Sequence, residues 1–152
     1  MMAASLPAAM DMVLVVQAVA SAAMCGIIWF VQAVHYPLFA RVQGQEREFA
    51  LENQRRTQSV VIPLMLAEGI AAAVIAWAPP AGVPRPVAVA GVVALAVLWL
   101  STALVQMPLH ARLARDGHAP AVVAALVRSN WLRTLTWTLR AALAAWMLRV
   151  AA

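Results

Sequence analysis

The sequence predicts an all-α fold, a four-helix transmembrane bundle built from two tandem helical-hairpin repeats. Hydrophobic residues make up 64% of the 152-residue chain, charged residues make up 11%, and the mean hydropathy is +0.83. A soluble domain of this size cannot bury so much apolar surface. Four apolar stretches are each long enough to cross a bilayer. Two short motifs also occur twice, in the same order along the chain.

The four apolar stretches indicate a single domain, residues 1–152, in which each crossing needs about 20 residues. The first stretch contains the single cysteine, Cys25, which excludes a disulfide within the chain. Two consecutive prolines, Pro79 and Pro80, end the second stretch. The expected spans are residues 12–34, 60–77, 87–107 and 131–150, the last of which continues a helix that begins near Pro120.

The charge distribution predicts a topology. The formal net charge is +5, and the basic residues are eleven arginines and no lysine. Most of them lie in residues 41–58 and 111–129, and arginine-rich short loops are typical of the cytoplasmic side. We therefore expect an integral protein of a bacterial inner membrane, embedded in the lipid bilayer, with both termini outside and these two long loops inside. The arginines form no stripe with interleaved aromatics, so we expect no nucleic-acid partner.

An internal repeat is visible in two motifs. Residues 37–41 read Pro-Leu-Phe-Ala-Arg and residues 108–112 read Pro-Leu-His-Ala-Arg, each at the end of an odd-numbered span. Residues 53–57 and 130–134 both read Asn-x-x-Arg-Thr, each leading into an even-numbered span. Two hairpins in the same orientation would bring like elements to one membrane face. Chance matching in so biased a composition is the alternative.

Polar side chains inside the apolar spans predict a pocket at the cytoplasmic face. Such groups are costly in a membrane unless they face protein or a water-filled cavity, so we expect them to point inward. Hydrogen bonds that only hold the helices together are the alternative. The candidate ligand-binding residues are Gln32, Gln106 and Trp137 within the spans, together with Asn53 and Asn130, which begin the two Asn-x-x-Arg-Thr motifs.

Two charged residues inside spans predict a buried ion pair. Glu68 is the carboxylate within the second span, and Arg140 is the most deeply placed base. An ionised group at this depth costs several kcal/mol unless it is paired or hydrated. We therefore expect Glu68 and Arg140 to pair, with a proton relay, a ligand site or a water-exposed Glu68 as alternatives.

The histidines raise the question of a cofactor. His35 and His110 are near the same predicted face, so haem held by two imidazoles is a minor alternative. Their spacings argue against equivalence, because His35 precedes its proline whereas His110 follows its own. Zinc would need further ligands in a recognised spacing, which the sequence does not offer. We expect no cofactor and no metal.

Three segments carry a family resemblance. They are Val-His-Tyr-Pro-Leu-Phe at residues 34–39, Arg-Arg-Thr before Val-Val-Ile-Pro-Leu-Met, and Asn-Trp-Leu-Arg-Thr at residues 130–134. Together they resemble a family of small, uncharacterised bacterial four-helix membrane proteins, which is distantly similar to the anthrone-oxygenase-like membrane proteins. In such relatives a histidine is expected three residues before the arginine, where this chain has Asn53 and Asn130.

The resemblance implies a pocket that binds or oxidises a lipophilic aromatic or quinone-like small molecule without a tightly bound cofactor. On that hypothesis the catalytic residues would be Arg56 and Arg133, stabilising a phenolate or enolate, with His35 or His110 moving the proton. One alternative is a noncatalytic accessory subunit or assembly factor bound to a membrane protein partner. Another is a transporter protomer, which would need a homo-oligomer because four spans make a thin wall. The sequence does not decide whether the protein is an enzyme.

Overall fold

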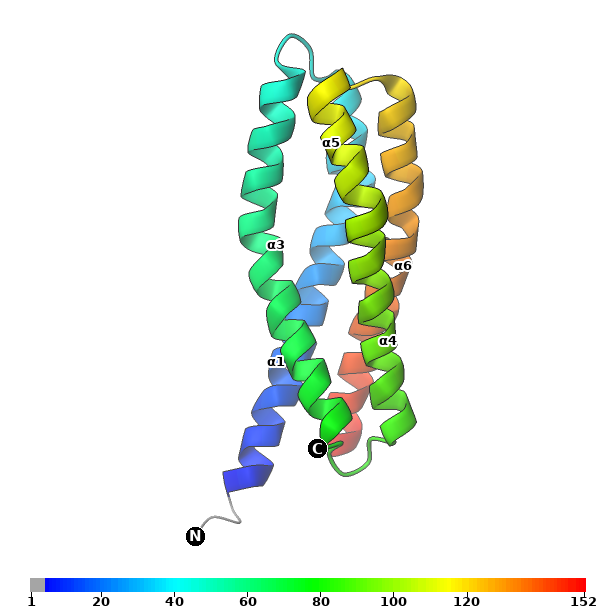
Figure 1. Cartoon of the computed structure of the whole chain (residues 1–152). Helices are drawn as coiled ribbons and strands as arrows, with labels where there is room; N and C mark the ends of the chain where they lie inside the picture. The colour runs from blue at the N-terminus through cyan, green and yellow to red at the C-terminus, as the bar shows by residue number, and fades with distance from the viewer. Residues whose placement is uncertain (1–4) are drawn as a thin grey trace.

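The protein is seen in a computed structural model that describes the backbone of residues 5–152 and the side chains from residue 8 onward. The described residues form four long helical rods and contain no strand, which confirms the all-α prediction with four helices (Figure 1). The second rod is α3 (Glu46–Trp77) and the fourth is α6 (Pro120–Ala151). The other two rods are interrupted by π-helices. The first consists of α1 (Ser5–Phe30), η1 (Val31–His35), α2 (Tyr36–Leu38) and the 3-10 helix η2 (Phe39–Arg41), and the third of α4 (Arg85–Ser101), η3 (Thr102–Gln106) and α5 (Met107–Asp116).

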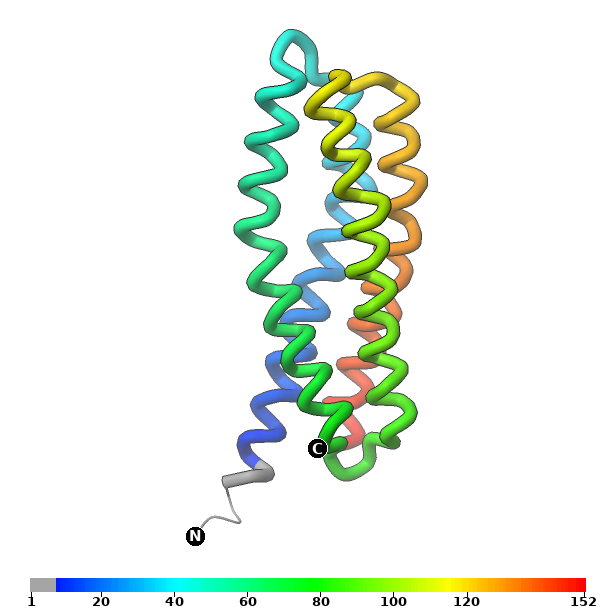
Figure 2. Tube along the Cα trace, in the orientation of Figure 1, coloured from blue at the N-terminus to red at the C-terminus, as the bar shows by residue number. Residues whose placement is uncertain are grey.

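The rods alternate in direction around a ring. The first rod packs against α3 and α6, and the third rod packs against the same two helices from the other side. Figure 2 shows the turns at residues 42–45 and 117–119 together at one end of the bundle. The turn at residues 78–84 lies at the other end, beside the start of α1 and the end of α6. This arrangement is that of an up-down-up-down four-helix bundle.

The helices extend further than the sequence predicted. Residues 41–58 and 111–129 were expected to be long loops, but α3 already begins at Glu46, and only residues 117–119 separate α5 from α6. The first of these segments is rich in Glu, Arg, Gln and Leu, which are good helix formers. Glu52 also pairs with Arg56 one turn later, which supports the exposed part of α3. The expected helix start near Pro120 is confirmed.

Both π-helices end two residues before a proline. The amide of Tyr36 donates to the carbonyl of Val31, and the amide of Met107 donates to that of Thr102. Pro37 and the corresponding proline of the third rod have no amide hydrogen, and their rings crowd the carbonyl four residues earlier. A turn widened by one residue relieves that clash. The same local structure therefore occurs at the same point of the two Pro-Leu-x-Ala-Arg motifs.

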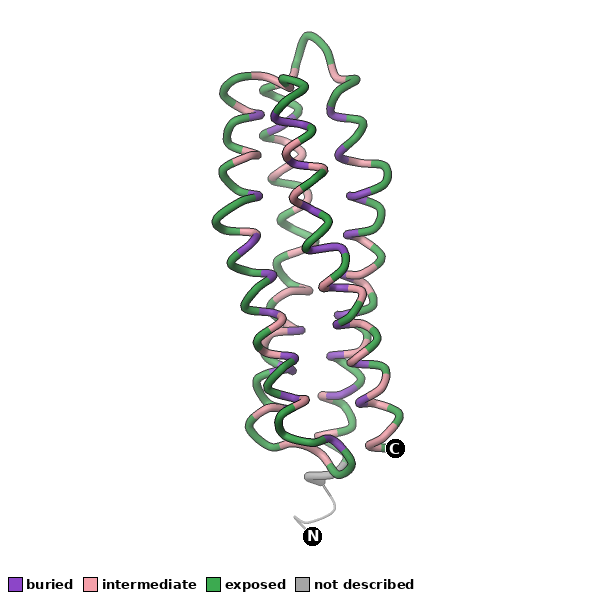
Figure 3. Tube along the Cα trace, turned by 90° about the vertical axis from the view of Figure 1, so that its right-hand side faces the viewer, coloured by how far each residue is buried: buried purple, intermediate pink, exposed green. Residues whose placement is uncertain are grey.

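Polar and charged side chains are buried in this bundle, while many large apolar side chains are exposed. Buried positions follow the inner side of each rod (Figure 3), and beside a mostly apolar core they include polar residues such as Gln17, Glu68 and Asn130. The outer surface carries large exposed apolar side chains such as Ile70 and Leu139. Polar groups that face inward behind an apolar outer surface are typical of helices that meet lipid.

Three helical segments of the described chain are long and apolar enough to cross a membrane by length and composition: Ala8–Arg41, Glu46–Trp77 and Arg85–Asp116. Sequence analysis expected four such spans. The fourth rod, α6, falls short because its arginines lower its mean hydropathy. Two of those arginines, Arg133 and Arg140, are buried against the other rods.

Candidate functional site

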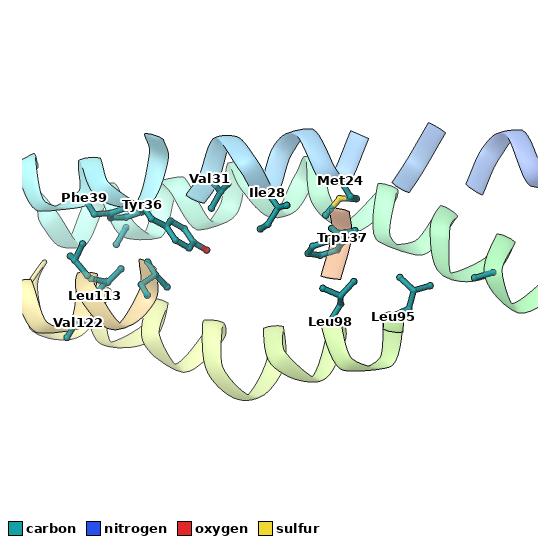
Figure 4. Close-up of a cluster of buried hydrophobic side chains, with 14 residues drawn as sticks. Met24, Ile28, Val31, Tyr36, Phe39, Leu95, Leu98, Leu113, Val122 and Trp137 are labelled. Carbon is teal, nitrogen blue, oxygen red and sulfur yellow. The ribbon is translucent and has the colours of Figure 1, made fainter. Parts of the chain in front are cut away.

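A cavity of about 100 Å³ lies inside the half of the bundle nearer the turns at residues 42–45 and 117–119. Its apolar wall comes mainly from the first rod, where Met24, Ile28 and Val31 follow one another along the helix (Figure 4). In the same view Trp137 lies toward one end of this row. Tyr36 lies toward the other end and directs its hydroxyl back along the row. The cavity therefore follows the bundle axis over the distance from Met24 to Tyr36, about 18 Å of helix.

Both π-helices border this cavity. Val31 and His35 come from η1, and Thr102 and Gln106 come from η3. Across η3 the buried positions Ser101 and Gln106 lie five residues apart instead of three or four, and across η1 Val31 and Tyr36 have the same separation, with Gln32 also buried between them. π-Turns of this kind occur frequently at functional sites. Here they bring polar side chains from two rods to one space.

Part of the polar lining is hydrogen-bonded between rods. Tyr36 and His110 are hydrogen-bonded to each other, with 3.1 Å between the hydroxyl oxygen and imidazole Nε2. The amide nitrogen of Gln106 donates to the hydroxyl of Ser129 at 3.0 Å. The other polar residues that line the cavity are His35, Asn53, Gln54, Thr57, Gln58, Thr102 and Arg133.

Four buried polar atoms of the lining have no hydrogen-bond partner in the described part of the chain. They are His35 Nε2, His110 Nδ1, Gln106 Oε1 and Arg133 Nε. Leaving a buried polar group unpaired costs about 1–3 kcal/mol, and native proteins contain few such groups. Four of them around one cavity indicate that the space holds polar atoms of a ligand or of water.

Arg133 is the cation of this cavity, and it is only 7% exposed. Its Nη1 donates to the side-chain oxygen of Asn130 at 3.0 Å, and its guanidinium lies 5.4 Å from the centre of the Trp137 ring. Among the residues that the structure describes, no acidic side chain lies within ion-pair distance of Arg133. A buried cation surrounded by neutral groups is costly unless a charge from elsewhere compensates it.

A layer of hydrogen bonds behind the cavity fixes the position of Arg133. The Asn130 amide donates to Gln32 Oε1 at 2.9 Å, and the Gln32 amide donates to the carbonyl of Val127 at 3.2 Å. Gln32, Asn130 and Trp137 were expected to bind a ligand, but none of the three lines the cavity. They instead hold the arginine that does. Of the predicted ligand-binding residues, Asn53 and Gln106 do line it.

Glu68 and Arg140 lie together one layer deeper. Arg140 Nε donates to Glu68 Oε1 at 3.1 Å, and Nη2 of the same guanidinium is also 3.1 Å from this oxygen. Ser21 donates to Oε1 at 2.6 Å, and the indole of Trp137 donates to Oε2 at 3.1 Å. Both charged side chains are almost completely buried. The carboxylate is therefore satisfied on both oxygens, and Trp137 contacts this ion pair as well as Arg133.

The placement of Arg56 corrects a sequence prediction. Arg56 was expected at the pocket with Arg133, but it is exposed and pairs with Glu52. At about 100° per residue, Asn53 and Thr57 share the face of α3 that lines the cavity, whereas Arg56 lies well away from it. Arg56 and then Arg55 hold the pKa of Glu52 below its ordinary value through these hydrogen bonds. Arg56 therefore belongs to the outer surface of the bundle.

Two contributors to the site were missed by sequence analysis. Tyr36 was noted only as part of the segment at residues 34–39, although it lies next to His35 and one turn before Phe39, on the inward side. Ser21 follows Gln17 by four residues and precedes Met24 by three. That helical spacing on the polar face was a usable signal for Ser21. The contact between Tyr36 and His110 had no such signal, because it joins two rods.

The haem alternative does not fit this site. A cavity of about 150 Å³ holds one benzene ring, so about 100 Å³ does not admit a porphyrin. His110 Nε2 is also engaged with Tyr36. Among the described residues, no group of three or more His, Cys, Asp or Glu side chains is placed to hold a metal ion.

Comparison with protein-family models, with curated proteins and with solved structures found no match for this chain. The resemblance to anthrone-oxygenase-like membrane proteins therefore stays a prediction.

Proposed function

We propose that this chain is a four-span membrane protein that binds a lipophilic small molecule through an oxygen-bearing head. One observation carries the proposal: a cavity with largely apolar walls has four unpartnered polar atoms among its lining residues, on His35, His110, Gln106 and Arg133. Ligand sites in proteins have this character, with mostly apolar lining and a few convergent polar groups. A polar head would satisfy the four atoms, and an apolar body would match the walls.

The apolar outer surface and the inward-facing charged residues of the bundle support the membrane part of the proposal. Three segments have the length and composition of a span, and α6 turns Arg133 and Arg140 inward while exposing Leu135 and Leu139. We propose that α6 crosses as well, and that the arginine-rich end of the bundle is cytoplasmic.

Cysteine labelling tests this topology. In a Cys25→Ser background, Gln43→Cys and Ala119→Cys place thiols in exposed turns at one end, and Ala81→Cys places one at the other. Gly117 is unsuited to the purpose because its φ of 75° disfavours any residue with a side chain. We expect an impermeant maleimide added to intact cells to label only position 81. Labelling of positions 43 and 119 from outside would contradict the orientation.

The tandem repeat is also proposed. In its favour, two π-helices precede two prolines at the same point of the repeated motif, and the rods alternate as two hairpins would. The copies have since diverged at the arginine, which is exposed at Arg56 and buried at Arg133. The geometric test is superposition of the two halves. If the repeat is real, residues 12–79 should superpose on residues 87–150 by a rotation about an axis along the bundle.

A second candidate function is proton transfer on the bound molecule. The observation that favours it is the hydrogen bond between Tyr36 and His110 on the cavity wall, which joins two groups able to exchange a proton. Arg133 would then stabilise a developing oxyanion. Oxidation of a lipophilic aromatic or quinone-like molecule is the reaction that the family resemblance implies. The accessory-subunit and transporter functions stay alternatives.

Native purification tests the binding proposal. Wild-type protein is extracted without heating into an uncharged detergent, and the small molecules that co-purify are identified by mass spectrometry. Val31→Phe fills the cavity from η1, while Val34→Phe places the same ring on the exposed side of the same helix. We expect a lipophilic molecule with wild type and Val34→Phe, and its loss with Val31→Phe. Equal recovery from all three proteins, or none above the lipid background, would contradict the proposal.

A further inference from the structure

We propose that the ligand is an amphiphile with a singly charged carboxylate head, bound by Arg133, and one apolar tail that leaves the cavity between α3 and α5. This inference rests on the proposed function and specifies the class of molecule that it concerns.

The charge of the head follows from the neighbours of Arg133. Its polar neighbours in the described chain are all neutral, namely the Asn130 amide oxygen, the Tyr36 hydroxyl and the Trp137 ring, and its Nε is unpartnered. The other buried arginine, Arg140, has its own carboxylate in Glu68. The protein thus supplies an anion to one buried cation and none to the other, although both lie on the inner side of α6. An anionic ligand head would neutralise Arg133 and occupy Nε in the paired geometry that guanidinium and carboxylate groups favour.

The number of charges favours a carboxylate over a phosphate. Arg133 is the one arginine among the residues that line the cavity, and no lysine occurs in the chain. A single negative charge leaves this site neutral. A phosphate monoester carries about −1.5 to −2 at pH 7, so it would leave an uncompensated negative charge in a buried space.

The size of the cavity requires that most of the ligand lies outside it. About 100 Å³ is smaller than the cavity of about 150 Å³ that holds benzene, so it admits a head and the first few carbons of a chain. Gln58 of α3 and Met107 of α5 both line the cavity and are exposed on the outer surface. The cavity therefore opens sideways between these two helices.

This opening lies at the edge of the apolar surface. The second apolar span begins at residue 60 and the third ends at residue 107. Gln58 and Met107 therefore lie where the apolar part of each helix meets its polar part. A tail that emerges there can turn into the hydrocarbon of the bilayer, while a ligand without a tail would gain nothing from a lateral opening. The molecule that fits both features has a buried anionic head and an apolar chain in the membrane.

The experiment compares four probes on purified wild-type protein in an uncharged detergent. Dodecanoate, dodecan-1-ol and dodecyl phosphate share one tail and differ in head charge, and decylubiquinone supplies a neutral quinone head. Binding is measured by native mass spectrometry and by the shift in unfolding temperature. We expect dodecanoate to bind with at least roughly tenfold higher affinity than each of the other three.

Two matched pairs of variants locate the binding. Arg133→Met removes the charge in the cavity, and Arg128→Met removes an exposed one from the same helix. Met107→Trp blocks the opening, and Leu104→Trp adds the same ring to an exposed position of the same rod that does not line the cavity. We expect the preference for dodecanoate over dodecan-1-ol to vanish in Arg133→Met, and dodecanoate binding to weaken at least roughly tenfold in Met107→Trp. Both controls should behave as wild type.

The outcomes separate this inference from the proposed function. If decylubiquinone or dodecan-1-ol binds as well as dodecanoate, and Val31→Phe abolishes that binding, the cavity binds lipophilic molecules but the anionic class is wrong. Tighter binding of dodecyl phosphate would overturn the carboxylate assignment. If Arg133→Met and Arg128→Met weaken dodecanoate binding equally, the carboxylate is attracted by the arginine-rich end in general. If no probe binds wild type, the proposed function fails as well.

Discussion

Arg133 and Arg140 lie about two turns apart on the inner side of α6, yet they have different partners. Arg140 is paired with Glu68, whose two oxygens also accept hydrogen bonds from Ser21 and Trp137. Arg133 has neutral neighbours, a free Nε and a cavity beside it. Burial alone therefore does not define the role of a charged side chain inside the bundle. A cation with its own buried carboxylate stabilises the bundle, whereas a cation with neutral neighbours on a cavity points to a ligand.

Breaking the ion pair between Glu68 and Arg140 should have the largest effect on stability. Arg140→Met leaves the Glu68 carboxylate buried without its cation, and Glu68→Gln leaves Arg140 without its anion. Each change should lower the free energy of unfolding by about 3–5 kcal/mol. The double variant should recover a large part of that loss, because no unpaired charge remains. Thermal unfolding in detergent measures all three, and additive losses would show that the two groups act independently.

A smaller loss is expected where α4 approaches this pair. A Cβ atom at Gly91 would lie 2.5 Å from Arg140 Nη1, so Gly91→Ala must displace the guanidinium. We expect a loss of about 1–3 kcal/mol, as for other overpacked sites. Gly26 is the matched control, because a Cβ there meets nothing within 4 Å. If Gly91→Ala and Gly26→Ala unfold at the same temperature, the arginine has room that the static structure does not reveal.

The Arg→Met substitution that destabilises the protein at Arg140 should not destabilise it at Arg133. Arg133→Met removes a buried cation that has no acidic partner in residues 5–152, at the cost of one hydrogen bond to Asn130. Without ligand, the free energy of unfolding should stay the same or rise by about 1 kcal/mol. Thermal unfolding of delipidated Arg133→Met and Arg140→Met side by side gives the comparison directly. Equal destabilisation would remove the distinction between the two sites.

The smallest effect on stability and binding is expected in the first copy of the Asn-x-x-Arg-Thr motif, residues 53–57. Arg56 is exposed and pairs with an exposed Glu52, and exposed ion pairs contribute little to stability. Arg56→Met should therefore change neither the unfolding temperature nor the binding of dodecanoate. A clear loss of binding would return Arg56 to the site and make the two copies functionally alike.

Much of the architecture could be predicted because it follows from composition and the cost of buried charge. The four rods follow from the apolar stretches, and the proximity of Glu68 to Arg140 follows because each was the other's best available partner at that depth. His35, His110 and Arg133 were also expected at a common pocket, and all three line the cavity.

The remaining features depend on information that a motif does not contain. Arg56 matches Arg133 in sequence, but its direction is set by the helical phase of α3 and by Glu52 one turn earlier. The continuous helix from Glu46 to Trp77 was not predicted, because the second span was taken to begin with the apolar residues near 60. The role of Tyr36 depends on a contact with His110 in another rod. Phase and contacts between rods are properties of the packed bundle.

The two π-helices change the helical phase of the first and third rods. A π-turn is an α-turn that has accepted one extra residue, so the chain beyond Pro37 or Pro108 is rotated by about 100° relative to an uninterrupted helix. A strict helical period that is carried through either π-helix is therefore about one residue out of phase beyond it. The bundle behaves as though one residue had been inserted at the same point of each half. Ala33 and Ala103 both face outward. Deleting one of them would remove the extra residue from its π-helix, and it is the deletion that should displace the fewest neighbouring side chains in that half of the bundle.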